Sequence, residues 1–340
     1  MYNVMLLFIM SNDVVPTPPL ERVADTTGPN ATEAFSILGN ETRLAILLAL
    51  WEELDPFSEH PTDATLGDAV PFAVLRKRVG MPDGSQFNYH LSRLVGRFVR
   101  KSDEGYELTT AGEEVVRTII ATAGFDRQTT EPVEISEPCP FCGAPSAVTY
   151  RNYRLYQLCT ECPGNFSTGG EHPEGVINAW KSSPALLNHG SAEEIFHAST
   201  RDAAHRYALR YEGVCDKCSG PVTPNLHVCE DHDSPDGETC PNCDRRFEVG
   251  CRFVCSACKA ASICPVLKAV LVPHHPEIDE FLVRHGVVPE FPYLTEIPEL
   301  ETDESVVSVD PLRVRVTLGI HGEQLELLLD ESADVIEATG

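Results

Sequence analysis

All 13 cysteines of this chain lie between Cys139 and Cys264, and ten of them form five C-x-x-C pairs. A C-x-x-C turn places two sulfur atoms on one side of a tight loop. Two such turns facing each other provide the tetrahedral set of four thiolates that Zn²⁺ prefers. The 138 residues before Cys139 contain no cysteine. The sequence therefore predicts a metal-binding C-terminal part and an N-terminal part that folds without metal.

The spacing of the pairs predicts two zinc ribbons. Sixteen residues separate Cys142 from Cys159, and the pairs that begin at Cys215 and Cys255 follow the similar segments GV and FV. The expected ligands of the two zinc ions are Cys139, Cys142, Cys159 and Cys162 in the first ribbon, and Cys215, Cys218, Cys255 and Cys258 in the second.

Two further groups of residues are less constrained by spacing. The set Cys229, His232, Cys240 and Cys243 either binds a third zinc ion or includes a histidine that is an ordinary loop residue. Cys251 and Cys264 have no C-x-x-C partner, and we expect them to be small buried apolar side chains.

The predicted zinc sites are structural. A catalytic zinc needs three protein ligands and an open position for water, whereas four thiolates close the coordination sphere. The chain also contains no H-E-x-x-H, phosphate-loop or G-x-S-x-G motif, which are the signatures of common hydrolytic and phosphate-binding sites. We therefore expect that the protein is not an enzyme.

The N-terminal part has the element order of a winged helix-turn-helix domain. Helical periodicity runs through residues 33–38 and 41–51, then through 71–79, and a further helix begins at Asp83 or Ser85. Two short strands, 98–101 and 106–108, flank an Asp-Glu-Gly turn, and Thr110 is positioned to cap a last helix.

The segments AFSILGNETRLAILLALW and SQFNYHLSRLVGRFVRKSDEGYELTTAGEEVVR resemble the arsenical-resistance repressor (ArsR) family of winged-helix regulators. The resemblance covers residues 32–124 and implies a homodimer that binds operator DNA. Metal-sensing members of that family carry cysteine ligands in this domain, and here there are none, which argues against direct sensing of arsenic or cadmium. The C-terminal part resembles the zinc-ribbon regions attached to winged-helix regulators of halophilic archaea.

The helix after Asp83 has two distinct faces. At 100° per residue, Phe87, Leu91, Leu94 and Val95 fall on one side and polar side chains fall on the other. Residues 71–101 contain seven basic side chains against Asp83 alone, a local charge of +6 in a chain of net charge −26. Neutralisation of DNA phosphates explains such a basic segment, and the alternative is a face that is merely solvated.

Double-stranded DNA is therefore the expected partner. Gln86 or Asn88 matches the hydrogen-bonding edge of adenine in the major groove, and Arg93 matches that of guanine. The predicted contacts are Arg76, Lys77, Arg78, Ser85, Gln86, Asn88, Tyr89, Ser92, Arg93, Arg97, Arg100 and Lys101.

The overall composition indicates the salt conditions and the cellular compartment in which the protein works. The chain has 52 acidic and 26 basic residues, of which only six are lysine. This balance is typical of proteins that work at very high salt, where repulsion between like charges is screened; the alternative is an acidic protein of ordinary cytosol. Residues 1–10 are apolar but too short to span a bilayer, and paired thiols indicate a reducing compartment. We expect a cytoplasmic protein without a membrane segment.

Together these observations predict an α+β multidomain chain. Its expected parts are a flexible tail (1–30), a winged helix-turn-helix DNA-binding domain (31–127), a first zinc ribbon (133–175) and a connecting helical segment (176–213). A second zinc ribbon with a Cys/His insert (214–265) follows, and then a C-terminal segment (266–340) with a helix at 276–284 and an antiparallel β-hairpin, because apolar residues alternate strictly from Leu312 to Ile320. The expected function is transcriptional regulation by sequence-specific DNA binding of the winged-helix domain, with a C-terminal part that is stabilised by zinc and binds a ligand or a protein partner. The alternative is a basal transcription or scaffold protein whose domains bind polymerase or other proteins.

Overall fold

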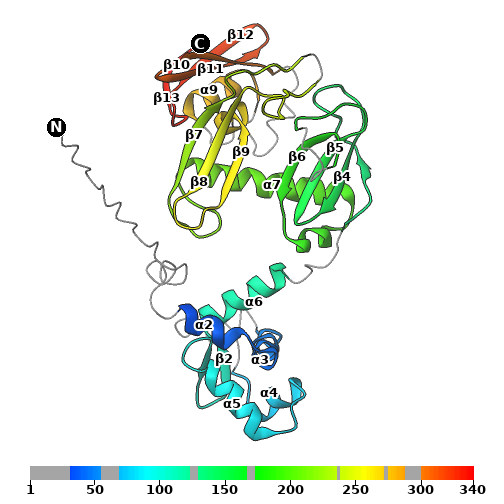
Figure 1. Cartoon of the computed structure of the whole chain (residues 1–340), viewed down its shortest axis with the longest axis vertical. Coiled ribbons are helices and arrows are strands. Elements are labelled where there is room, and N and C mark those ends of the chain that lie inside the picture. Colours follow the sequence, from blue (N-terminus) through cyan, green and yellow to red (C-terminus); the bar gives the residue numbers. More distant parts are fainter. Residues whose placement is uncertain are drawn as a thin grey trace, which may run out of the picture. The chain divides into compact units, whose positions relative to one another are not determined.

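A computed structural model describes residues 31–54, 69–122, 129–166, 173–235, 238–271, 275–287 and 300–340 (Figure 1). The chain forms two compact units, Met1–Ile120 and Ala121–Gly340, which we call the head and the body. The tail predicted at 1–30 lies outside the described residues. Within the described ranges, no helix is long and apolar enough to cross a membrane.

The head contains helices joined by one β-hairpin. Its elements are α2 (Ala31–Leu38), α3 (Glu41–Trp51), α4 (Phe72–Arg78), α5 (Gly84–Leu94), β1 (Val99–Lys101), β2 (Tyr106–Leu108) and α6 (Thr110–Thr122). Asn40 caps α3 by accepting a hydrogen bond from the backbone of Arg43. Thr109, and not the predicted Thr110, caps α6. The hydroxyl of Thr109 accepts a hydrogen bond from the backbone N–H of Gly112 and donates one to the carbonyl of Arg97.

One core holds the head together. Leu47 of α3, Leu75 of α4, and Phe87 and Leu91 of α5 are fully buried in it, next to Val99 of β1. The two strands pair antiparallel, with Val99 opposite Leu108. The apolar side of α5 thus faces the core, which leaves its polar side toward solvent.

The first sheet of the body has the order β3-β4-β5-β6 and is antiparallel. Its strands are β3 (Val133–Ile135), β4 (Ser146–Arg151), β5 (Arg154–Cys159) and β6 (Val176–Lys181). The predicted boundary at residue 175 does not match this sheet, because 176–181 pairs with β5 and does not belong to a connecting helical segment. After the short helix η1 (Pro184–His189), α7 (Ala192–Tyr211) begins at a capping box formed by Ser191 and Glu194.

The second sheet has the order β7-β8-β9, with β7 (Val222–Val228), β8 (Val249–Cys255) and β9 (Ala261–Pro265), and leads into α8 (Val266–Leu271). After α9 (Pro276–Arg284), a third sheet has the order β10-β11-β12-β13. Its strands are β10 (Glu301–Val309), β11 (Leu312–Ile320), β12 (Glu323–Leu329) and β13 (Val335–Thr339). The predicted helix and hairpin are therefore present, and two further strands extend the hairpin.

The second and third sheets share a single core. Val316 of β11, Leu327 of β12, Phe281 of α9 and Phe253 of β8 are buried in the same cluster. Residues 266–340 therefore do not form a separate part, contrary to the predicted division, because the inward face of the hairpin is covered by the second ribbon. Cys251 and Cys264 lie opposite each other in this core.

The helix α7 joins the first sheet to the second (Figure 1). Near its start Phe196 packs with Tyr150 and Leu155 of the first sheet, and toward its end the ring of Tyr207 lies 5.9 Å from that of Phe253. A polar contact adds to this connection, since Lys268 of α8 donates to the side chain of Asn178 at 2.7 Å. The body is therefore one unit containing three sheets.

Candidate functional site

Three clusters of sulfur and nitrogen atoms in the body are arranged for metal binding. In each cluster, the four possible ligand atoms lie within 4.8 Å of one another. The clusters are Cys139, Cys142, Cys159 and Cys162; Cys215, Cys218, Cys255 and Cys258; and Cys229, His232, Cys240 and Cys243. The structure thus brings together each of the sets predicted from spacing, including the third.

The sulfur spacing fits zinc. A tetrahedral site with Zn–S bonds of about 2.3 Å requires sulfurs about 3.8 Å apart. The sulfurs of Cys139 and Cys162 are 3.7 Å apart, and those of Cys142 and Cys159 are 3.5 Å apart. No disulfide is formed among the described cysteines. The geometry is therefore that of a four-thiolate cage, consistent with zinc.

The same backbone turn builds four of the five C-x-x-C knuckles. In each turn the carbonyl of the first cysteine accepts a hydrogen bond from the backbone N–H four residues later. The backbone N–H of the same cysteine donates to the carbonyl five residues later. The fourth residue after the cysteine has a positive φ in every case, the left-handed conformation in which the backbone doubles back on itself. These turns begin at Cys139, Cys215, Cys240 and Cys255.

Ionisation within the cages is uneven. Hydrogen bonds from the backbone N–H groups of Cys258 and Ala257 outweigh the effect of desolvation and lower the pKa of Cys255 to about 6. By contrast, the neighbouring thiols Cys258 and Cys255 raise the pKa of Cys218 to about 12. Sulfurs this close do not all ionise unless a cation balances their charge. The four-thiolate form of each cage therefore depends on a bound metal ion, whose affinity decreases as pH decreases.

The third cluster includes a histidine that is positioned as a ligand. Nδ1 of His232 lies 3.5 Å from the sulfur of Cys243, and Nε2 lies 3.3 Å from the carbonyl oxygen of Arg246. When Nε2 carries the proton and donates it to this carbonyl, the lone pair of Nδ1 is free to bind a metal ion. The geometry supports the metal-binding alternative for this set.

Arg246 also connects the third cluster to the first, which the sequence did not indicate. Its guanidinium donates to the carbonyl of Gly164 at 3.0 Å, approaches the sulfur of Cys162 at 4.0 Å and stacks on the ring of Phe141, 4.3 Å from the ring centroid. A cation beside this cage offsets part of the negative charge of its thiolates.

In the head, most of the predicted DNA-contacting residues are exposed to solvent. Asp83 caps α5 by accepting from the backbone of Ser85 and Gln86. Ten predicted residues are exposed, namely Lys77, Arg78, Ser85, Gln86, Asn88, Tyr89, Ser92, Arg93, Arg100 and Lys101, whereas Arg76 and Arg97 are partly buried.

Internal contacts involve much of the predicted basic charge. Arg78 pairs with Glu52 and Glu53, Arg97 lies 3.5 Å from Glu33, and Arg100 lies 2.7 Å from Glu107. All four carboxylates lie outside residues 71–101. The charge of +6 counted for that segment therefore overstates the positive charge at the surface of the head.

Arg76 serves the turn between α4 and α5. It donates to the carbonyls of Met81 and Pro82 at 3.3 and 2.5 Å. Within the described head, Lys77 and Arg93 have no ion-pair partner, and Lys101 lies over the ring of Tyr106 at 5.8 Å. The described head residues include nine basic and ten acidic side chains, so the described part of the head is nearly neutral in a chain of net charge −26.

Two protein-family models match the chain, and each is described as a domain of unknown function. DUF7347 matches residues 31–119, and DUF7351 matches residues 136–335, which is more than half of the chain. The chain belongs to the DUF7351 family. The DUF7347 match falls within the head and the DUF7351 match within the body, so the two families follow the two units of the structure. No curated protein matches the chain.

Proposed function

We propose that the head is a winged helix-turn-helix domain that binds double-stranded DNA as a homodimer, and that the protein regulates transcription. The observation that carries this proposal is the division of α5. Phe87, Leu91 and Leu94 are buried in the core, while the other face is exposed and presents side chains that hydrogen-bond to base edges. A helix held rigidly by one face and polar on the other is suited to the major groove.

The recognition residues follow from chemistry and exposure. Gln86 and Asn88 carry amides that pair with adenine, and the guanidinium of Arg93 forms a bidentate pair with guanine. All three are exposed. Lys77 on α4 and Lys101 on β1 flank this helix in sequence and are exposed, so they are the phosphate-contacting residues of the proposal.

Homodimerisation is proposed from the resemblance to the ArsR family and from exposed apolar side chains. Phe35 of α2 is 72% exposed, and Ile120 of α6 is 44% exposed. Burial of two such side chains in a second copy stabilises a dimer. In this proposal the zinc ions of the body are structural, because the ligand sets contain no open position for substrate water.

A second candidate function has its own supporting observation. The described part of the head is nearly neutral, and Tyr89 on the same face of α5 is 58% exposed, with Val74 of α4 43% exposed. Exposed aromatic and apolar side chains on a neutral surface suit a protein partner, such as the polymerase of a basal transcription complex.

Selection of duplexes from a random pool distinguishes the two functions. DNA binding predicts enrichment of a palindromic site whose recovery is lost in Arg93→Ala and kept in Arg315→Ala, a body variant that removes the same charge. The absence of any sequence preference, together with co-purification of polymerase, supports the second function and contradicts the first.

A further inference from the structure

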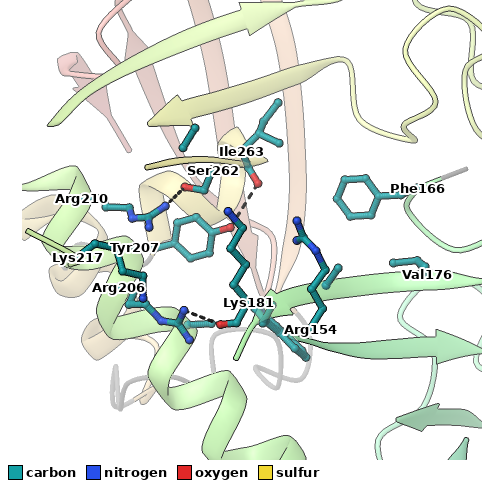
Figure 2. A pocket seen from close by; sticks show the side chains of 14 residues that line it. Arg154, Phe166, Val176, Lys181, Arg206, Tyr207, Arg210, Lys217, Ser262 and Ile263 are labelled. Carbon is teal, nitrogen blue, oxygen red and sulfur yellow. Dashed lines mark hydrogen bonds between the residues drawn. The ribbon is translucent and has the colours of Figure 1, made fainter. Parts of the chain in front are cut away.

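A cavity in the body collects positive charge. It has a volume of ≈ 340 Å³ and lies among β5, β6, α7 and β9 (Figure 2). Five of its lining residues are basic, namely Arg154, Lys181, Arg206, Arg210 and Lys217. Two of these are among the six lysines of a chain with twice as many acidic as basic residues. Chance placement of the few cations is a poor explanation for this concentration.

Three of the five cations are held by carboxylates and backbone. Arg206 pairs with Asp202 and donates to the carbonyl of Lys181 at 2.7 Å. Arg210 pairs with Asp216 at 2.5 Å, and Lys217 lies 3.2 Å from the other oxygen of Asp216. These contacts hold the three cations in place and engage the carboxylates of Asp202 and Asp216.

Arg154 and Lys181 form no ion pair with a carboxylate in the part of the chain that the structure describes. They are directly opposite each other in the register of β5 and β6, and Figure 2 shows both side chains extending into the same space. Like charges directly opposite on neighbouring strands destabilise a sheet. Among the described lining residues, no carboxylate is present to compensate them. An anion bound between the two side chains removes this repulsion.

The remaining walls of the cavity are apolar. The ring of Phe166 and the ring of Tyr207 lie on different sides of the space, with Ile263 close to Tyr207 (Figure 2). Tyr207 is fixed because its hydroxyl donates to the carbonyl of Ile263 at 3.3 Å. A ligand of this cavity therefore has an apolar or aromatic portion as well as a charged group.

We propose that this cavity binds a small phosphate monoester whose organic group is planar and apolar, with Arg154 and Lys181 holding the phosphate. A phosphate monoester carries about −1.5 to −2 charge at pH 7, so it offsets more of the positive charge of this cavity than the single charge of a carboxylate does. The arginine fork donates two hydrogen bonds to phosphate oxygens, and the lysine supplies a point charge. The site lies entirely in the body and does not depend on the proposed function of the head.

Calorimetry on the full zinc-loaded chain, in chloride buffer of constant ionic strength, tests the proposal with phenyl phosphate, inorganic phosphate and benzoate. We expect phenyl phosphate to bind most tightly and benzoate most weakly. Arg154→Gln and Lys181→Gln each reduce phenyl phosphate affinity about tenfold or more, as loss of a hydrogen bond to a charged group implies. Arg315→Gln, on the exposed side of β11, leaves it unchanged.

A second measurement separates binding from a structural role. Without ligand, Lys181→Gln is expected to keep or raise the unfolding temperature of the body, because it removes a repulsive pair. The proposal is overturned by a lower unfolding temperature in this ligand-free variant, by absence of binding for both phosphate probes, or by equal affinity for benzoate and phenyl phosphate.

Discussion

Replacing Cys142 by serine removes one ligand from the first cage and very little else. Cys142 is exposed, so exchanging its sulfur for oxygen changes almost no core packing. The loss of metal is a much larger perturbation. Structural zinc contributes about 10–16 kcal/mol of apparent binding free energy at pH 7, whereas the net stability of a domain is about 5–15 kcal/mol. We therefore expect the first sheet to unfold in Cys142→Ser when its zinc is lost.

Metal content and protease resistance report on this prediction in the same sample. The wild-type chain is expected to contain three zinc ions by elemental analysis, and Cys142→Ser one fewer. Proteolysis mapped by mass spectrometry should then cleave within β4 and β5, while the described head segments, residues 31–54 and 69–120, stay protected.

Cys251→Ser is the matched control. Its sulfur is fully buried but lies in the apolar core, so the hydroxyl costs about 1–3 kcal/mol without a change in zinc content. The reasoning is refuted if Cys142→Ser retains wild-type zinc and a protease-resistant body, or if zinc-free wild-type protein keeps its body folded.

Three further predictions concern other parts of the chain. Gly112→Ala should destabilise the head by about 1–3 kcal/mol in denaturant titrations, because the new methyl group would lie 2.1 Å from the carbonyl oxygen of Phe98. Gly84 has open space around it, so Gly84→Ala should be neutral or stabilising, and equal effects of the two substitutions would contradict the packing argument. Burial raises the pKa of Glu304 to about 7, so the stability of the wild-type body, measured relative to Glu304→Gln, should be highest in acid and fall as pH rises through 7. A constant difference in stability between the two proteins from pH 6 to 8 would be inconsistent with this. DNA affinity should fall with a logarithmic salt slope of about −2 per head, from the two phosphate contacts of Lys77 and Lys101 at about −0.9 each; a slope of about −4 or steeper per head would contradict this and would mean that the ion pairs of Arg78, Arg97 and Arg100 open on DNA.

Local pattern was enough to predict much of this structure. The helix at 276–284 and the strand at 312–320 have their observed bounds because amphipathic periodicity there agrees with burial. The cysteine sets were predictable because a knuckle places its two sulfurs by local backbone geometry. Their pairing followed from spacing, but spacing left the role of His232 open, because the orientation of its ring depends on the contact of Nε2 with the carbonyl of Arg246.

Contacts between distant segments were not predictable from the sequence. The strand β10 is rich in acidic and serine residues, which have low strand propensity, and it forms because it pairs with β11 at the edge of the third sheet. The ion pair of Arg78 with Glu53 joins α4 to the turn after α3 through tertiary packing. The opposition of Arg154 and Lys181 depends on strand register, so the charge of the cavity appears only in the fold.

In the proposed complex with DNA, the exposed face of α5 reads the bases. Affinities of wild-type protein, Arg93→Ala and Lys77→Ala for a selected duplex and its single-base variants test it most directly. We predict that Arg93→Ala loses about 1–3 kcal/mol of discrimination at one guanine position, while Lys77→Ala weakens all duplexes equally and reduces the salt slope by about 1. Unchanged base preference in Arg93→Ala, with wild-type affinity for every duplex, would contradict the claim.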